Sequence, residues 1–132
     1  MTKQHVILIK DHSSSMRSLS RQAARDYNAL LASLQDAARS KDIEIYASVI
    51  KCGIGPGKGR VEREVTNVNI QNLLPVSENY YPTDGNSTPL FDSVGEGIDI
   101  CRSLYHDDYI NRDLSFLVMV ITDGYENDSR KW

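Results

Sequence analysis

Three short segments of the chain carry oxygen-bearing side chains where an apolar run ends or a helical pattern begins. These side chains are two carboxylates and three hydroxyls: Asp11, Ser13, Ser15, Thr88 and Asp123. Such a set of hard oxygen ligands suits Mg²⁺ or Ca²⁺, whereas zinc and copper favour softer nitrogen and sulfur ligands. The sequence therefore predicts a divalent-cation site, provided that folding brings the three segments together.

The small number of carboxylates indicates what such a site would do. Two aspartates can balance the charge of a dication, but neutral hydroxyls donate weakly and leave the metal electrophilic. A vacant coordination position would then favour a carboxylate supplied by another protein. We expect a docking site that uses a metal, with no catalytic residues, and we predict that the protein is not an enzyme.

Each segment also has a simpler explanation when it is considered alone. The stretch from Asp11 to Ser15 could be a turn with a helix N-cap, because Asp and Ser are preferred there. Thr88 followed by Pro89 is a good N-cap with proline at the first helical position. Asp123 followed by Gly124 is a common strand-to-turn signal. Only their convergence at one edge of a sheet favours metal binding.

The elements expected to position these residues alternate between strands and helices. Apolar residues predict a buried strand at 6–9, a helix at 16–39, a strand at 42–51, a mixed polar strand at 61–70, a second helix at 90–104 and a fully buried strand at 114–122. This order predicts an α/β fold with an open, mostly parallel sheet, helices on both faces and one antiparallel edge strand. Ligands of such sheets bind beyond the carboxyl ends of the strands.

Bulk properties exclude several classes of function. The chain has 132 residues and a formal net charge of −3, which fits a single domain and argues against a nucleic-acid binder. Its longest apolar stretch falls far short of the roughly 20 residues that a membrane span needs. The N-terminus carries no signal-peptide pattern. We expect a cytoplasmic protein that contacts neither nucleic acid nor membrane.

The same three segments resemble motifs of one known family. DHSSSM resembles the DxSxS motif of von Willebrand factor type A (vWA) domains, with matches at Asp11, Ser13 and Ser15. GNSTPLFDSVGEGI is similar to the segment that carries the family's metal-binding threonine, here Thr88. VITDGYEN is similar to the later strand end that carries its second aspartate, here Asp123.

The resemblance implies a doubly wound, Rossmann-like fold with a metal-ion-dependent adhesion site. It implies Mg²⁺ as the usual ion, with Mn²⁺ or Ca²⁺ as alternatives, held by the hydroxyls of Ser13, Ser15 and Thr88. Asp11 and Asp123 would then act directly or through water, and an exposed Asp or Glu of a protein partner would complete the coordination. Bacterial or phage cytoplasmic domains of this kind often work beside AAA+ ATPases, which the resemblance suggests as a partner system.

The chain departs from the family pattern in two respects. Ser14 stands where the motif usually carries glycine, which restricts the backbone of the loop. Members of the family usually continue for two further strands and helices after the second aspartate. We therefore expect residues 1–132 to form one vWA-like domain that lacks those elements and leaves the strand at 114–122 at the edge of the sheet, free to pair or oligomerise with another chain.

Two other functions remain open from the sequence. A Mg²⁺-dependent phosphohydrolase also places an aspartate after the first strand, but such enzymes resemble DxDxT and carry a second acid where this chain has Ser13. A structural subunit could instead use the exposed sheet edge for assembly.

Overall fold

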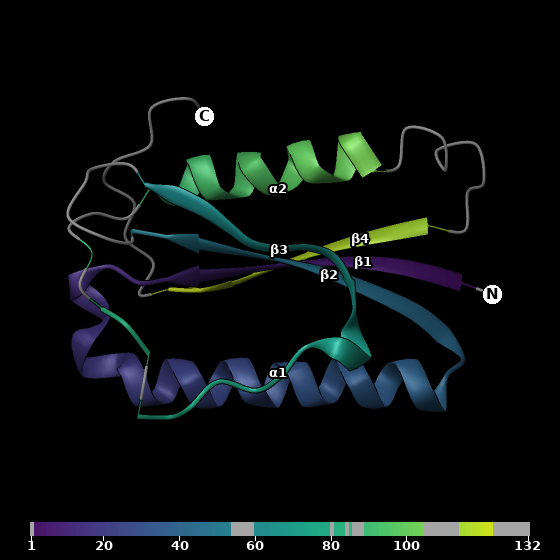
Figure 1. The fold of residues 1–132 in the computed structure, drawn as a ribbon, viewed down its shortest axis with the longest axis horizontal. Coiled ribbons are helices and arrows are strands. Elements are labelled where there is room, and N and C mark those ends of the chain that lie inside the picture. The colour runs from purple at the N-terminus through teal and green to yellow at the C-terminus, as the bar shows by residue number, and fades with distance from the viewer. Residues whose placement is uncertain are drawn as a thin grey trace.

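The computed structural model of the chain describes residues 2–53, 60–79, 81–83, 85, 89–104 and 114–122. They form an α/β fold around a four-stranded mixed sheet with strand order β3-β2-β1-β4 (Figure 1). The strands are β1 (Thr2–Asp11), β2 (Ile43–Cys52), β3 (Val61–Asn69) and β4 (Leu114–Ile121). β1 lies parallel to both β2 and β4, and β3 is an antiparallel edge strand beside β2. The predicted α/β class, with one antiparallel edge strand in the sheet, is thereby confirmed.

The two long helices cover opposite faces of the sheet (Figure 1). On one face, α1 (Ser20–Ser40) contributes Tyr27, Leu31 and Leu34 to a core shared with β1 and β2. On the other face, α2 (Leu90–Leu104) contributes Ile100 to a second core. Both helices were predicted from apolar residues at helical spacing. Among the described residues, no helix combines the length and the apolar character needed to cross a bilayer.

The predicted helix at 16–39 is divided into two parts. Its start is the 3₁₀ helix η1 (Ser14–Leu19), and the α-helix begins only at Ser20. The Met16 N–H donates to the Ser13 carbonyl at 3.0 Å, and the Ser14 N–H donates to the Gly85 carbonyl at 2.8 Å. The first hydrogen bond closes a three-residue turn, which is tighter than the four-residue turn of an α-helix. The second gives the Ser14 N–H an acceptor outside the helix.

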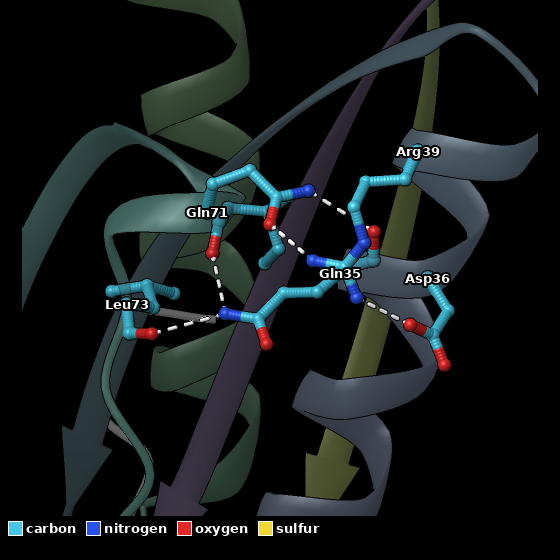
Figure 2. Close-up of polar contacts among 6 residues, drawn as sticks. Gln35, Asp36, Arg39, Gln71 and Leu73 are labelled. Carbon is cyan, nitrogen blue, oxygen red and sulfur yellow. Dashed lines mark hydrogen bonds and ion pairs between the residues drawn. The ribbon is translucent and has the colours of Figure 1, made fainter.

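A second 3₁₀ helix, η2 (Ile70–Asn72), follows β3 and continues into an extended segment. We call residues 70–77 the strap, because this segment runs along α1 (Figure 1). The Gln35 amide on α1 donates to the carbonyls of Ile70 and Leu73, at 3.0 and 3.1 Å (Figure 2 shows the bond to Leu73). Farther along, the Asn28 amide donates to the Val76 carbonyl at 2.8 Å and accepts from the Val76 N–H at 2.7 Å. Amide side chains of the helix therefore fix the backbone of the strap.

The prediction that the last strand is fully buried is wrong. Leu117, Met119 and Ile121 of β4 pack against the core on the α1 side. The opposite face is partly open, since Val118 is 39% and Val120 is 37% exposed. In the described part of the chain β4 pairs only with β1, and α2 covers β1 and β2. A continuous apolar run does not distinguish an edge strand from a central one, which explains the error.

The opposite edge of the sheet is irregular. The register of β3 against β2 shifts twice, between Ala47 and Val49 and between Val49 and Ile50. At the first shift Asn67 has a left-handed φ of 57°, and its N–H donates to the Ser48 hydroxyl at 3.0 Å. The same hydroxyl lies 3.0 Å from Nε2 of the buried His5. A buried polar chain from β1 through β2 thus supports the bulge in β3.

Candidate metal centre

Asp11 lies at the carboxyl end of β1 and is completely buried. Its Oδ1 accepts a hydrogen bond from the Ser13 N–H at 2.9 Å, and its Oδ2 accepts one from the Thr122 hydroxyl at 2.8 Å. The Tyr81 hydroxyl donates to the Asp11 carbonyl at 2.9 Å. The carboxylate is therefore held in one orientation by uncharged donors from the loop and from the end of β4.

Ser13 and Ser15 follow Asp11 in the chain and bring their hydroxyls close together. Their Oγ atoms are 3.0 Å apart, with Ser13 buried and Ser15 exposed. Adjacent oxygens around an octahedral Mg²⁺ with bonds of about 2.1 Å are separated by about 3 Å. The spacing of the two hydroxyls thus fits two neighbouring positions around Mg²⁺, and their side chains meet the requirement for hard oxygen ligands.

The helix-capping alternative receives no support from these hydroxyls. Ser13 occupies the N-cap position of η1 but makes no side-chain capping hydrogen bond. The residue before α1 is Leu19, which also lacks such a bond. The Ser13 and Ser15 hydroxyls contact each other instead, in a partly buried position.

Gly85 docks a distant loop onto the segment that contains the two serines. It forms an isolated parallel bridge with Ser13, and its N–H donates to the His12 carbonyl at 3.1 Å. A Cβ atom added to Gly85 would stand 1.1 Å from the Gly53 carbonyl oxygen, so only glycine permits this approach. The chain that leads to Thr88 is therefore anchored beside Ser13 three residues earlier, at Gly85.

The remaining two predicted ligands, Thr88 and Asp123, lie outside the described residues. One sequence neighbour of each, Pro89 and Thr122, is described. Pro89 directly precedes α2 and accepts a hydrogen bond from the Ser93 hydroxyl, while Thr122 bonds to Asp11. The strands that end before Asp11 and Asp123 are adjacent, with Lys10 opposite Ile121. The strand adjacency that the metal prediction requires is confirmed.

His12 and Tyr81 form the buried floor of this region, a role that sequence patterns did not reveal. Their ring centroids are 4.5 Å apart, and His12 Nδ1 lies 2.7 Å from the Pro82 carbonyl. Since a carbonyl only accepts, Nδ1 carries the proton and Nε2 the lone pair of a neutral ring. Burial lowers the pKa of His12 and so favours the uncharged ring. The hydrogen bond to the Pro82 carbonyl acts in the opposite direction, with a smaller effect.

Soft ligands are not prominent in this region. Burial raises the pKa of Cys52, which is near Asp11, to about 12, so its thiol stays protonated at neutral pH. Within the described ranges no group of three or more His, Cys, Asp or Glu side chains could hold a metal. The described part of the candidate site thus consists of one carboxylate and two hydroxyls.

Comparisons with known proteins add no family to these observations. No protein-family model matches the chain, and no curated protein sequence matches it.

Proposed function

We propose that this protein is a vWA-like, doubly wound domain that binds a protein partner through a divalent metal ion. Ser13, Ser15 and Thr88 supply hydroxyl ligands, and Asp11 and Asp123 supply charge directly or through water. The ion is Mg²⁺, with Mn²⁺ or Ca²⁺ as substitutes. Bound there, the metal supplies an electrophilic position that attracts a carboxylate.

One observation carries the proposal. The Ser13 and Ser15 hydroxyls lie 3.0 Å apart without a capping role, beside a buried carboxylate. Among the described residues, the donors to the Asp11 carboxylate are an uncharged N–H and a hydroxyl, so a cation beside it would offset the cost of burying a negative charge there. Support also comes from Gly85 and Thr122, which tie the segments containing Thr88 and Asp123 to the same loop.

The partner contributes an exposed Asp or Glu in this proposal. A hydroxyl-rich coordination sphere neutralises less of the metal's charge than a carboxylate-rich one does, so an external carboxylate gains more from binding. Ser15 is exposed whereas Ser13 and Asp11 are buried, so the metal would be approached from the side of Ser15. The notion that the partner belongs to an AAA+ ATPase system rests on the resemblance alone.

The test is a calorimetric titration with Mg²⁺ and Mn²⁺ of the wild type and of single-hydroxyl variants. Ser13→Ala and Ser15→Ala are each expected to weaken Mg²⁺ binding at least tenfold, because each removes one ligand. Ser14→Ala is the matched control, since Ser14 is exposed between them and donates its backbone N–H to Gly85, a hydrogen bond that alanine retains. Equal Mg²⁺ affinity in all three variants would refute the proposed site.

A second candidate function, assembly of two copies through the sheet edge, has an observation of its own. Val118 and Val120 are partly exposed on β4, and LSFLVMVI contains no charged residue. Two copies pairing antiparallel across a twofold axis would therefore bring no like charges together. Sedimentation velocity tests this function: a dimer that Val118→Lys converts to monomer supports it, and a monomeric wild type refutes it.

A further inference from the structure

A cavity of about 230 Å³ lies on the α1 side of the sheet, under the strap. Apolar side chains from β2, β3 and the strap line one part of it, among them Val49, Val65 and Leu73. Lys10 and Glu64 line another part. The cavity thus combines apolar walls with an ionic group, which is the usual composition of a small-molecule site.

Lys10 is the unusual residue of this cavity. Its side chain is only 4% exposed, although lysine is almost never buried without a partner. Its Nζ lies 2.9 Å from Glu64 Oε2 and 4.9 Å from the centre of the Tyr27 ring. An ammonium has three N–H donors, and these two contacts occupy one acceptor atom and one ring face. A further acceptor beside Lys10, within the cavity, would complete its hydrogen bonding.

The charges around the cavity favour a single negative charge on the ligand. Glu64 also lies 3.5 Å from Lys51, so two ammonium groups surround one carboxylate. The group carries a net charge of +1 when all three are ionised. A cation would be repelled by this net charge, and a dianion would exceed it while facing Glu64 at close range.

We propose that this cavity binds a small monocarboxylate with a short apolar body. One carboxylate oxygen accepts a hydrogen bond from Lys10, and the apolar body contacts Val49, Val65 and Leu73. Because an apolar cavity of about 150 Å³ holds benzene, this one accommodates a ligand of roughly eight to ten non-hydrogen atoms. The site is separate from the candidate metal centre, since Lys10 and Asp11 are consecutive on a strand and face opposite sides.

The test uses 4-methylpentanoate as the probe and its neutral isostere 4-methylpentanamide as the matched ligand. Each is titrated into the uniformly ¹⁵N-labelled chain and followed by amide chemical shifts, with EDTA present so that no metal can bind the carboxylate. The acid is expected to shift the signals of Val49 and Val65 with a Kd on the order of 1 mM or below. The amide is expected to bind at least tenfold more weakly. Unshifted cavity signals, or equal affinities for acid and amide, would overturn the proposal.

Two lysine variants identify the group that recognises the carboxylate. Lys10→Met is expected to abolish the preference for acid over amide. Lys51→Met removes the same charge from the neighbouring strand, outside the cavity lining, and is expected to retain most of that preference. A preference that survives in folded Lys10→Met would refute the role of Lys10. If Lys10→Met does not fold, the comparison of acid and amide on the wild type decides the matter.

Discussion

Lys10 and Asp11 are consecutive residues of β1 that bury opposite charges on opposite faces of the sheet. Asp11 is held by uncharged donors, a backbone N–H and the Thr122 hydroxyl, which come from separate segments of the chain. Lys10 contacts one charged partner among the described residues, Glu64 on the edge strand β3. The Asp11 side therefore depends on correct assembly of the backbone, whereas the Lys10 side depends on a single ionic contact.

The largest expected effect comes from Gly85→Ala, which disturbs the contacts on the Asp11 side and not those on the Lys10 side. The new Cβ would stand 1.1 Å from the Gly53 carbonyl oxygen, so two backbone segments would have to separate. We expect the free energy of unfolding to fall by about 3 kcal/mol or more, measured by urea denaturation, with loss of Mg²⁺ binding.

Gly97→Ala is the control for that substitution. Its Cβ would lie 2.8 Å from Ile7 Cγ2, a side-chain atom that can move, so a loss of about 1 kcal/mol is expected. Wild-type stability and Mg²⁺ binding in Gly85→Ala would contradict the idea that the Asp11 side depends on this backbone approach.

On the Lys10 side, loss of the Glu64 carboxylate and loss of the Lys10 ammonium are expected to lower the free energy of unfolding by different amounts. Glu64→Gln leaves an ammonium that is 4% exposed without its carboxylate, which should cost about 3 kcal/mol of unfolding free energy. Lys10→Met leaves a carboxylate that is 34% exposed and still near Lys51, which should cost about 1 kcal/mol. Denaturation of both variants checks the order, and a larger loss in Lys10→Met would reverse the argument.

A third buried group, His5, extends the comparison, because it lies on the same face of β1 as Asp11 but is held neutral. Burial chiefly, and Lys3 secondarily, lower the pKa of His5 from 6.5 to about 4. The unfolded chain therefore binds a proton at a higher pH than the folded one. The contribution of His5 to stability is complete above pH 6.5 and declines as the pH falls toward 4, by about 2 to 3 kcal/mol in all.

The variant His5→Gln isolates this contribution from that of His12, whose pKa is lowered as well. Unfolding free energies are measured from pH 7 to pH 4 for both proteins. The difference between wild type and variant should shrink across that range, and a constant difference would show that His5 does not titrate in this window.

The smallest expected effect concerns the hydroxyl of Thr122, the residue after β4, which donates to Asp11. Thr122→Val removes the donor to Asp11 Oδ2 and should cost about 1 kcal/mol of unfolding free energy. Because the carboxylate is then less firmly oriented, Mg²⁺ binding should weaken up to tenfold in calorimetry. Thr122→Ser retains the hydroxyl and should restore the Mg²⁺ affinity; a failure to do so would assign the loss to the missing methyl group.

Much of the framework could be predicted from local patterns in the sequence. The helical spacing of Tyr27, Leu31 and Leu34 indicated α1, and the mixed polar character of residues 61–70 indicated an edge strand. The adjacency of β1 and β4 was a condition on which the metal prediction depended, and the structure shows it. Asp11, Ser13 and Ser15 lie near one another because they are close in sequence, at the end of β1 and the start of η1, and their role as metal ligands stays a prediction.

The contacts that fix the site were not predictable in the same way. No local pattern around Tyr81 or Gly85 indicates their contacts, which join residues some seventy positions apart. The predicted strand at 6–9 ended before Lys10, because a lysine after an apolar run normally marks exposure. Its burial depends on Glu64, which is on β3 and near in space only after the bulged edge has formed.

The strap has a consequence for how this chain can vary over evolution. Asn28 and Gln35 bind it through backbone atoms, which every residue type provides except for the N–H of proline. Side chains such as Leu74, which is 79% exposed, can therefore change without loss of these bonds. Insertions and deletions are another matter, because the two amides sit about two helical turns apart and match one spacing of the strap. Natural selection would therefore conserve the number of residues in the strap more strictly than their identities.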